Sequence, residues 1–463
     1  MVLSKSNWTL PCLLCYGFLI PFVVYIFSDI LKSNNRLIMA TASVKTKSSS
    51  GSGGKPKKYV GVYLCTWNVA YSKPVDLTDA LHLHQSTLPE IYAIGLQEVN
   101  NDHTGTGRNS WSAAITDILK PKDYVRVRVR SMQGILLIIF AKRSILPFIT
   151  NFESEATRTG LNGLWGNKGG VSVRLDIYGM NVIIVNSHLA AHRDNLLERI
   201  EDYDSVIDHQ KFKDDDVDNI MDHDYVLWMG DLNFRLNELT KEEAIKCSEN
   251  KDYEKLLKFD QLILAMQAGL VFEDFHEGEI SFPPTYKFDI NTDQYDSSEK
   301  QRVPAWCDRI LWYTHDTSYD DVCLDVQQLH YHSHPVYKVS DHKPVSSLFH
   351  IQVFPNPPRL PVTFYPIKEF RQKRDNLINY KMVSSGSSYY NDWIGLYKAD
   401  FTALTEYVTY IWAVQGVEKR GVSGVTLAFT KEWMTAPPGE YCLLYLTKNY
   451  SLLGISQTFQ VLP

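Results

Sequence analysis

Hydrophobic positions in the middle of the chain fall into short apolar runs that end in polar residues. Such runs, rich in β-branched and aromatic residues, are typical of buried strands. The run over residues 169–189 has Tyr178-Gly179 near its centre, and this pair predicts a hairpin of two antiparallel strands. The runs cover residues 59–69, 91–99, 134–142, 169–189 and 225–232.

Helical spacing of apolar residues occurs between these runs. It predicts helices over Ser112–Leu119 and Asp194–Asp208, and a third, interrupted helix over Lys241–Ala268. Strands mixed with helices and a hairpin favour an α+β layered domain over a doubly wound parallel sheet.

The pattern changes at Phe354, where four prolines fall within a few residues and indicate a domain junction. The tail of about 110 residues that follows has short apolar runs at regular spacing and no long helical pattern. This spacing predicts a β-sandwich. The runs are 393–398, 409–414, 424–430, 440–446 and 458–462.

The N-terminal segment has no charged residue from Ser6 to Ser28, and residues 9–28 are long enough to span a bilayer. A retained membrane anchor, a cleaved signal peptide and an alternative start at Met39 all remain open. Basic residues follow the run, which places the bulk of the chain on the cytosolic side. This basic, Gly/Ser-rich stretch either is a solvated linker or contacts anionic lipid.

Composition narrows the class of protein. The 463 residues suggest two to three domains, and 44% hydrophobic with 22% charged residues are ordinary globular values. A net charge of −6 argues against a dedicated nucleic-acid binder. Seven cysteines, an odd number, do not form a disulfide framework and suggest a reducing compartment.

Six polar signatures lie at the ends of the predicted strands or in adjacent loops. Because loops at a sheet end bring separate segments together, their recurrence predicts one shared site. They supply carboxylate, amide and imidazole groups but no thiolate set, which suits Mg²⁺ and phosphoester hydrolysis rather than structural zinc. They are Trp67-Asn68, Gln97-Glu98, Asn186-Ser187-His188, Gly230-Asp231-Leu232-Asn233, Cys307-Asp308-Arg309 and Ser340-Asp341-His342.

A glycine-rich stretch from Gly160 to Gly170 lacks the Lys-Ser/Thr pair of a nucleotide-binding P-loop. We expect it to form a mobile loop.

Eight segments between Tyr59 and about Gln352 resemble the inositol polyphosphate 5-phosphatases and follow that family's order. The resemblance implies the endonuclease/exonuclease/phosphatase fold, a four-layer α/β sandwich. The segments are TWNVA, GLQEV, WGNKGGVSVRL, VNSHLAAH, WMGDLNFRL, PPTYKFD, KQRVPAWCDRILW and SDHKPV.

The resemblance also implies roles for individual residues. Asp231 activates the attacking water, and His342, oriented by Asp308, stabilises the developing phosphate charge. Asn233 and His188 contact the scissile phosphate, and Asp341 lies near the metal and its water. The implied Mg²⁺ ligands are Glu98 and Asn68, and the implied substrate-binding residues are Asn167, Lys168, Tyr286, Lys300 and Arg302.

The tail segments NDWIGLYK and PPGEYCLLYL resemble the SKICH domain, an immunoglobulin-like β-sandwich found in a subgroup of these phosphatases. The predicted organisation is therefore an apolar anchor with a basic linker (1–58), a 5-phosphatase domain (59–352) and a SKICH domain (353–463).

The resemblance implies hydrolysis of the 5-phosphate of phosphatidylinositol 4,5-bisphosphate and 3,4,5-trisphosphate, and of soluble inositol polyphosphates, by direct water attack. The enzyme would be a negative regulator of phosphoinositide signalling. The expected partners are phosphoinositide head groups, a membrane surface and a protein bound by the SKICH domain, without nucleic acid. The expected location is the cytoplasmic face of the endoplasmic reticulum or plasma membrane, with a soluble cytosolic form as the other option. A non-catalytic SKICH adaptor and a metal-dependent nuclease of the same superfamily are the alternatives.

Overall fold

The structure is a computed structural model. The N-terminal apolar run and basic linker lie outside the residues that it describes. None of the helices in the described part is long and apolar enough to cross a bilayer. The described residues are 58–463 without 101–108, 162, 214–216, 318, 321, 358, 383–390, 414–416 and 419–423.

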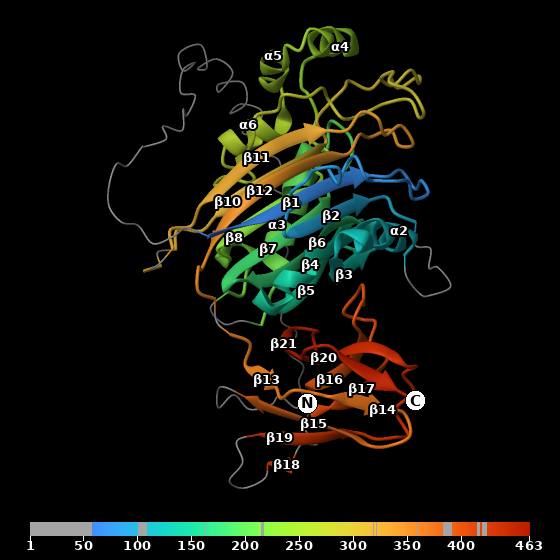
Figure 1. Cartoon of the computed structure of the whole chain (residues 1–463). Coiled ribbons are helices and arrows are strands. Elements are labelled where there is room, and N and C mark those ends of the chain that lie inside the picture. Colours follow the sequence, from blue (N-terminus) through green and yellow to red (C-terminus); the bar gives the residue numbers. More distant parts are fainter. Residues whose placement is uncertain are drawn as a thin grey trace, which may run out of the picture. The chain divides into compact units, whose positions relative to one another are not determined.

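Two six-stranded sheets form the first domain (Figure 1). The first has the order β11-β12-β1-β2-β4-β3, in which β1 and β2 are parallel. Its strands are β1 (Lys58–Asn68), β2 (Ile91–Gln97), β3 (Tyr124–Met132), β4 (Ile135–Lys142), β11 (Val326–Ser333) and β12 (Val345–Val353).

The second sheet has the order β5-β6-β7-β8-β10-β9, in which β7 and β8 are parallel. The hairpin predicted at Tyr178-Gly179 is confirmed, since it joins the antiparallel strands β6 and β7. The strands are β5 (Ile149–Gly160), β6 (Trp165–Ile177), β7 (Met180–His188), β8 (Tyr225–Asp231), β9 (His276–Glu277) and β10 (Asp308–Thr314).

Alternation along the strands separates the cores. On β1, Val62 and Leu64 face the core between the sheets, whereas Tyr63 and Trp67 face a core shared with α2. A third core lies between the second sheet and α3 and α6. The order helix, sheet, sheet, helix is the predicted four-layer sandwich. The helices are α2 (Ser110–Leu119), η2 (Lys120–Lys122), η3 (Arg143–Phe148), α3 (Leu196–His209), η4 (Ile220–Asp222), α4 (Lys241–Glu249), α5 (Tyr253–Leu257) and α6 (Gln261–Gln267).

The expectation of a mobile glycine loop was wrong. Gly160 ends β5 and the other glycines from Gly166 onward lie in β6, so only the tight turn between these strands is left outside them. Gly169 has φ +125°, and a Cβ atom there would lie 2.0 Å from the Thr157 carbonyl oxygen. The glycine therefore serves a close approach of two strands.

The tail folds as the predicted β-sandwich. One sheet has the order β13-β15-β19-β18 and the other β14-β22-β20-β16-β17, with β21 paired to β20. The core between them includes Tyr380 and Phe429 from the first sheet and Ile394 and Leu443 from the second. The strands are β13 (Val362–Phe364), β14 (Glu369–Arg371), β15 (Asn376–Met382), β16 (Trp393–Lys398), β17 (Thr409–Trp412), β18 (Val417–Glu418), β19 (Val425–Phe429), β20 (Gly439–Leu446), β21 (Leu452–Ile455) and β22 (Phe459–Leu462).

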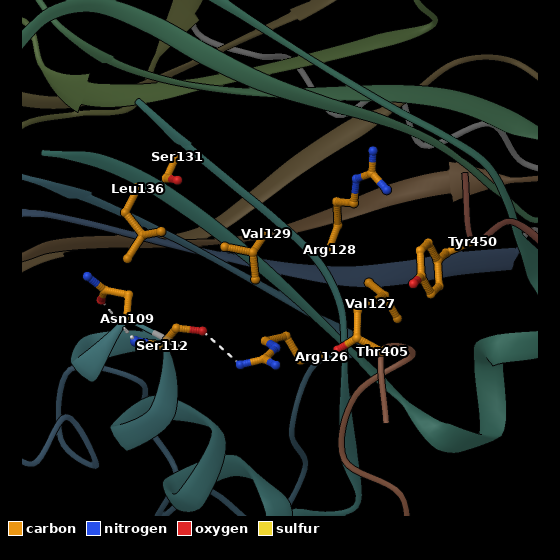
Figure 2. Close-up of a pocket in the computed structure, with 10 residues that line it drawn as sticks. All are labelled: Asn109, Ser112, Arg126, Val127, Arg128, Val129, Ser131, Leu136, Thr405 and Tyr450. Atoms are coloured by element: carbon orange, nitrogen blue, oxygen red, sulfur yellow. Dashed lines mark hydrogen bonds between the residues drawn. The ribbon is translucent and has the colours of Figure 1, made fainter. Parts of the chain in front are cut away.

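A segment of the tail covers the edge strand β3. The Arg126 N–H donates to the Thr402 carbonyl (2.8 Å), and the Leu404 N–H donates to the Arg126 carbonyl (3.2 Å). Figure 2 shows Arg126 hydrogen-bonded to Ser112 of α2, in a pocket of about 310 Å³ that Tyr450 of the tail also lines. Pairing with the tail satisfies backbone groups that an open sheet edge would leave exposed.

Asn186 and Gln97 connect the two sheets through buried hydrogen bonds. The Asn186 amide on β7 donates to the carbonyls of Leu96 (3.2 Å) and Leu136 (3.0 Å) in the first sheet. It accepts from the Gln97 side chain (2.6 Å). Both residues belong to polar signatures that the sequence analysis assigned to the shared site, and here they join the sheets.

We expect Asn186→Ala to lower the free energy of unfolding by about 2–4 kcal/mol, because it leaves buried polar groups without partners. Chemical denaturation measures the change. The matched control is Asn379→Ala, whose side chain is exposed and hydrogen-bonded only to Thr426 in the described structure. Equal losses for the two variants would contradict the role of Asn186.

Candidate active site

The ends of three neighbouring strands bring the candidate catalytic residues together. In the register of the second sheet, His188 on β7 is paired with Asp231 on β8, and Asp231 is paired with Asp308 on β10. Gly230 has φ +153°, and a Cβ atom there would lie 2.0 Å from the Ser187 carbonyl oxygen. A glycine before Asp231 therefore lets the ends of β7 and β8 approach.

Asp231 is the centre of this cluster and is almost fully buried. Its Oδ2 accepts from Asn68 Nδ2 (2.9 Å) at the end of β1 and lies 3.3 Å from His188 Nε2. The same oxygen is 3.8 Å from His342 Nε2, and Oδ1 accepts from the Asn233 backbone N–H (3.1 Å). Both sheets therefore contribute to the surroundings of one carboxylate.

The surroundings of Asp231 keep it ionised. Burial raises the pKa of a carboxyl group, but His342, His188 and Lys168 outweigh it and hold the pKa of Asp231 well below its usual range. Lys168 Nζ also contacts His188 Nε2. Burial and this lysine lower the pKa of His188, which is therefore neutral near pH 7.

His342 is held by a second buried carboxylate. Its Nδ1 donates to Asp308 Oδ2 (2.9 Å), which also accepts from the Thr285 hydroxyl (2.7 Å). Burial favours the neutral ring, but Asp308 and Asp231 raise the pKa of His342 to about 9. The imidazole therefore carries a positive charge at neutral pH. Its Nε2 faces Asp231.

Asn233 follows β8 with φ +59°, a conformation that asparagine tolerates better than most residues. Its Nδ2 donates to the Leu189 carbonyl (3.0 Å), and its Oδ1 accepts from Arg235 Nη2. The Arg235 guanidinium lies 4.2 Å from the centre of the Tyr286 ring. The Tyr286 ring in turn lies 4.4 Å from the His342 ring.

The surroundings of Glu98 fit a divalent metal ion. Glu98 follows β2, is partly buried, and its carboxylate has no hydrogen-bond or ion-pair partner among the described residues. Its charge influences both Lys168 and His188. Asp308 Oδ1 is a buried carboxylate oxygen without a hydrogen-bond partner in the described structure. The ligand atoms of Asp231, Asp308 and His342 lie within 4.8 Å of one another. The predicted pair Glu98 and Asn68, together with the carboxylates of Asp231 and Asp308, offers the oxygen donors that hard cations take, whereas the protonated His342 is not a ligand.

The predicted substrate-binding residues separate into two groups. Lys168 contacts the catalytic cluster through His188, and Tyr286 does so through His342. Arg302 lies near Tyr286. Burial raises the pKa of Tyr286, and the positive charges of Arg235 and Arg302 lower it in part. Asn167 and Lys300 are exposed, and the described structure gives their side chains no contact with the cluster.

Asp341 lies beside His342 but points to another partner. Its Oδ2 accepts from Lys287 Nζ (2.7 Å). This contact raises the pKa of Lys287, although burial lowers it. Together with His342, the contact also lowers the pKa of Asp341, although burial raises it. The predicted place of Asp341 near the metal stays a prediction.

Residues 65–348 match the family described as Endonuclease/Exonuclease/phosphatase family 2, and residues 362–461 match the SKICH domain. The chain is 36% identical over 446 residues to inositol polyphosphate 5-phosphatase K of Mus musculus, with 92% of this chain and 93% of the mouse protein covered. The chain belongs to the inositol polyphosphate 5-phosphatases.

Two further relatives support the assignment of this chain to the 5-phosphatase family. Phosphatidylinositol 4,5-bisphosphate 5-phosphatase A of Rattus norvegicus is 36% identical over 86% of this chain, which spans 42% of the rat protein. The solved 5-phosphatase domain of SPsynaptojanin, in complex with inositol (1,4)-bisphosphate and calcium ion, is 33% identical. The match covers 72% of this chain and 91% of the solved domain, with a TM-score of 0.58. Cimex nitrophorin, at 24% identity and a TM-score of 0.53 over 64% of this chain and 100% of its own, shares the fold alone.

Sequence reasoning missed two cationic residues of the phosphatase site. Arg235 holds Asn233, and Lys287 holds Asp341. Arg235 lies two residues after Asn233, and Lys287 lies one residue after Tyr286. Both are inside segments that resemble the family, and this position is the sequence signal that could have identified them. An isolated Arg or Lys in a sequence is otherwise most often a surface residue.

We expect Asp308→Asn to lower the pKa of His342 by about 1–3, because it removes the negative charge that favours the imidazolium. Titration of the histidine NMR signals measures the shift. Asp316→Asn, at an exposed position, is the matched control. An unchanged pKa in Asp308→Asn would show that Asp308 does not set the charge of His342.

Proposed function

We propose that this enzyme removes the 5-phosphate of phosphatidylinositol 4,5-bisphosphate and 3,4,5-trisphosphate, and of soluble inositol polyphosphates, and so lowers phosphoinositide signals. The observation that carries the proposal is the ionised Asp231 beside the charged His342, surrounded by cationic residues. The names of the relatives support the substrate class. The ligand of the solved relative, inositol (1,4)-bisphosphate, is what remains when a 1,4,5-trisphosphate loses its 5-phosphate.

In this proposal Asp231 accepts a proton from the attacking water. It is ionised at neutral pH, and its Oδ2 is held from two sides by Asn68 and His188. A bound phosphate adds negative charge next to Asp231 and raises its proton affinity, which favours general-base catalysis. Direct attack needs no nucleophilic side chain, and the phosphorus–oxygen bond to the inositol ring breaks as water adds.

Charged donors around Asp231 serve the phosphoryl oxygens. His342 carries its second N–H toward the cluster, and Lys168 lies beside His188. Arg235 supplies a further buried cation, whose pKa is raised by Cys307, Tyr286 and Asp231 despite burial. Such fixed donors stabilise the charge that develops in phosphoryl transfer without having to reorganise.

Mg²⁺ is the metal that we propose for this site. Glu98 would bind it through its free carboxylate, with Asn68 beside it. The bound ion would neutralise phosphate charge and polarise the phosphoryl group.

The 4-phosphate is proposed to lie toward Tyr286, Lys287 and Arg302. Arg302 and Lys287 interact electrostatically, and no ion pair of Arg302 occurs among the described residues. An arginine without a counter-charge is suited to forked binding of a phosphate. Lys300 is exposed nearby in sequence and would reach the same phosphate from solvent.

A membrane surface is the proposed setting. Leu161, Leu164 and Trp165, in and beside the turn between β5 and β6, are 73%, 81% and 55% exposed. They precede Lys168, so apolar side chains lie in sequence beside a site residue, an arrangement that supports contact with lipid. Together with the charge asymmetry of the N-terminal segment, it supports the cytoplasmic face of the endoplasmic reticulum or plasma membrane.

A protein partner of the SKICH domain is also proposed. Strand β17 is an edge of its sheet and carries the exposed Tyr410 and Trp412. Exposed edges with aromatic side chains are suited to binding an extended peptide.

We expect Asp231→Asn to lower kcat by about 10²–10⁴, because the amide cannot accept the proton from water. Phosphate release is measured with short-chain phosphatidylinositol 4,5-bisphosphate, the 5-monophosphate and the 4-monophosphate, in Mg²⁺ or EDTA. The wild type should cleave the first two, leave the 4-monophosphate intact and need Mg²⁺.

Glu249→Gln, at the exposed end of α4, is the control for that series. Absence of release from any 5-phosphate by the folded wild type would contradict the proposed function and favour the adaptor role.

We expect Arg302→Gln to raise KM about tenfold for the 4,5-bisphosphate and to leave the 5-monophosphate nearly unchanged, because only the former carries a 4-phosphate. Steady-state kinetics on both lipids give the comparison, with Arg359→Gln as an exposed control in the domain junction. Equal losses on the two substrates would place Arg302 outside the 4-phosphate subsite.

A further inference from the structure

Four histidines gather on the first sheet, away from the residues assigned to catalysis. His330 and His332 occupy alternate positions near the end of β11, so their side chains lie on one face of the strand, and His334 follows β11 directly with its ring near that of His82. The buried Tyr331 between them lies on the other face and donates to Glu277 (2.8 Å). His82, from the connection between β1 and β2, completes the group, which we call the histidine cluster.

The rings of the histidine cluster are close together. The ring centres are 4.7 Å apart for His82 and His330, 5.2 Å for His330 and His332, and 5.5 Å for His82 and His334. Two imidazoles that share one tetrahedral zinc ion at an Zn–N distance of about 2.0–2.1 Å have ring centres about 5 Å apart. The centre-to-centre spacing matches that of ligands around a common ion, but His330 and His332 lie nearly parallel (5°) and His334 Nε2 is hydrogen-bonded to Ser346 Oγ (2.7 Å), so the rings must turn to share an ion.

The chemistry of the cluster also favours a metal ion. His330 Nε2 is buried and has no hydrogen-bond partner in the described structure. A buried polar atom of this kind marks a place where an ion or water is needed. Burial and the neighbouring rings lower the pKa values of His330 and His334 to about 3 and about 4, so both rings are neutral at pH 7. Neutral imidazole is the form that binds transition metals.

We propose that the histidine cluster binds one divalent transition-metal ion of the zinc type. The nitrogens of three of its rings do not yet lie within 4.8 Å of one another, as the ligand atoms at Asp231 do. Binding therefore includes rotation of rings about their Cβ–Cγ bonds, a soft torsion in histidine. His332 is exposed and His82 partly exposed, so both have room to turn.

A metal ion at this cluster would hold the segment that leads to the active site. The His334 backbone N–H donates to the Pro344 carbonyl (2.8 Å), and Asp341 and His342 lie between these two residues. A metal ion would thus join His82 to His334, which precedes His342 in the chain and is hydrogen-bonded to Pro344, which follows it. The site is distinct from the Mg²⁺ site because it offers nitrogen rather than oxygen donors.

The test measures Zn²⁺ binding to the full chain in excess Mg²⁺, which keeps the oxygen-rich site occupied. Equilibrium dialysis should give one Zn²⁺ per chain, and Zn²⁺ but not Ca²⁺ should raise the thermal midpoint. His332→Asn and His330→Phe should each weaken Zn²⁺ binding at least tenfold. The control His350→Phe, on the adjacent strand β12 and outside the cluster, should bind as the wild type does.

A cysteine variant gives a second, direct readout. In His332→Cys, Co²⁺ should produce a thiolate-to-cobalt charge-transfer band that the wild type, with its exposed Cys323, does not show. Absence of this band, Zn²⁺ binding that all variants retain, or no Zn²⁺ binding in the presence of Mg²⁺ would each overturn the proposal. Phosphate release is not needed for any of these measurements, so failure here is separate from failure of the proposed function.

Discussion

The buried carboxylate of Asp231 is the group on which the active site depends. A negative charge with almost no access to water is stable only where donors and positive charges compensate for its lost hydration. Those groups come from separate segments, namely Asn68 at the end of β1, His188 at the end of β7 and His342 before β12. The requirement for compensation thus fixes how strand ends of both sheets meet. The same groups are the ones proposed to act on the phosphate.

The separation of the two sheets is set directly behind this layer of charged groups. Gln97 and Asn186 hydrogen-bond across the sheets, and they immediately precede Glu98 and Ser187. Gly95 belongs to the same contact, because a Cβ atom there would lie 2.8 Å from the Asn186 side chain. A polar contact of fixed length specifies the separation of two packed sheets more sharply than apolar side chains do. Glu98 and His188, which are proposed to bind the metal and the phosphate, therefore lie close in sequence to a pair of residues that joins the sheets.

The sequence predicts the fold class and the central residues because both follow local rules. Apolar runs that end in Asn, Asp or His predict strands with polar ends, and parallel neighbours bring those ends together. Three features escaped these rules. The glycines from Gly160 to Gly170 have the composition of a loop but permit close strand packing, which depends on a partner strand that a single segment does not reveal. Gln97 and Asn186 match the polar pattern of a site, but their side chains hydrogen-bond between the two sheets. Arg235 and Lys287 resemble surface cations, and only the tertiary contacts with Asn233 and Asp341 distinguish them.

The sandwich itself does not determine the reaction. Cimex nitrophorin shares this fold, so the layers and their cores are compatible with another function. In this chain the candidate site lies at the strand ends, where Gly230 permits a close contact and two buried acids raise the pKa of His342. The coupling is mutual: Asp308 and Asp231 favour the protonated form of His342, and the protonated His342 favours the ionised form of both carboxylates. The two buried carboxylates differ in their surroundings: Asp231 Oδ2 faces Asn68, His188 and His342, whereas Asp308 Oδ2 is held by Thr285 and His342.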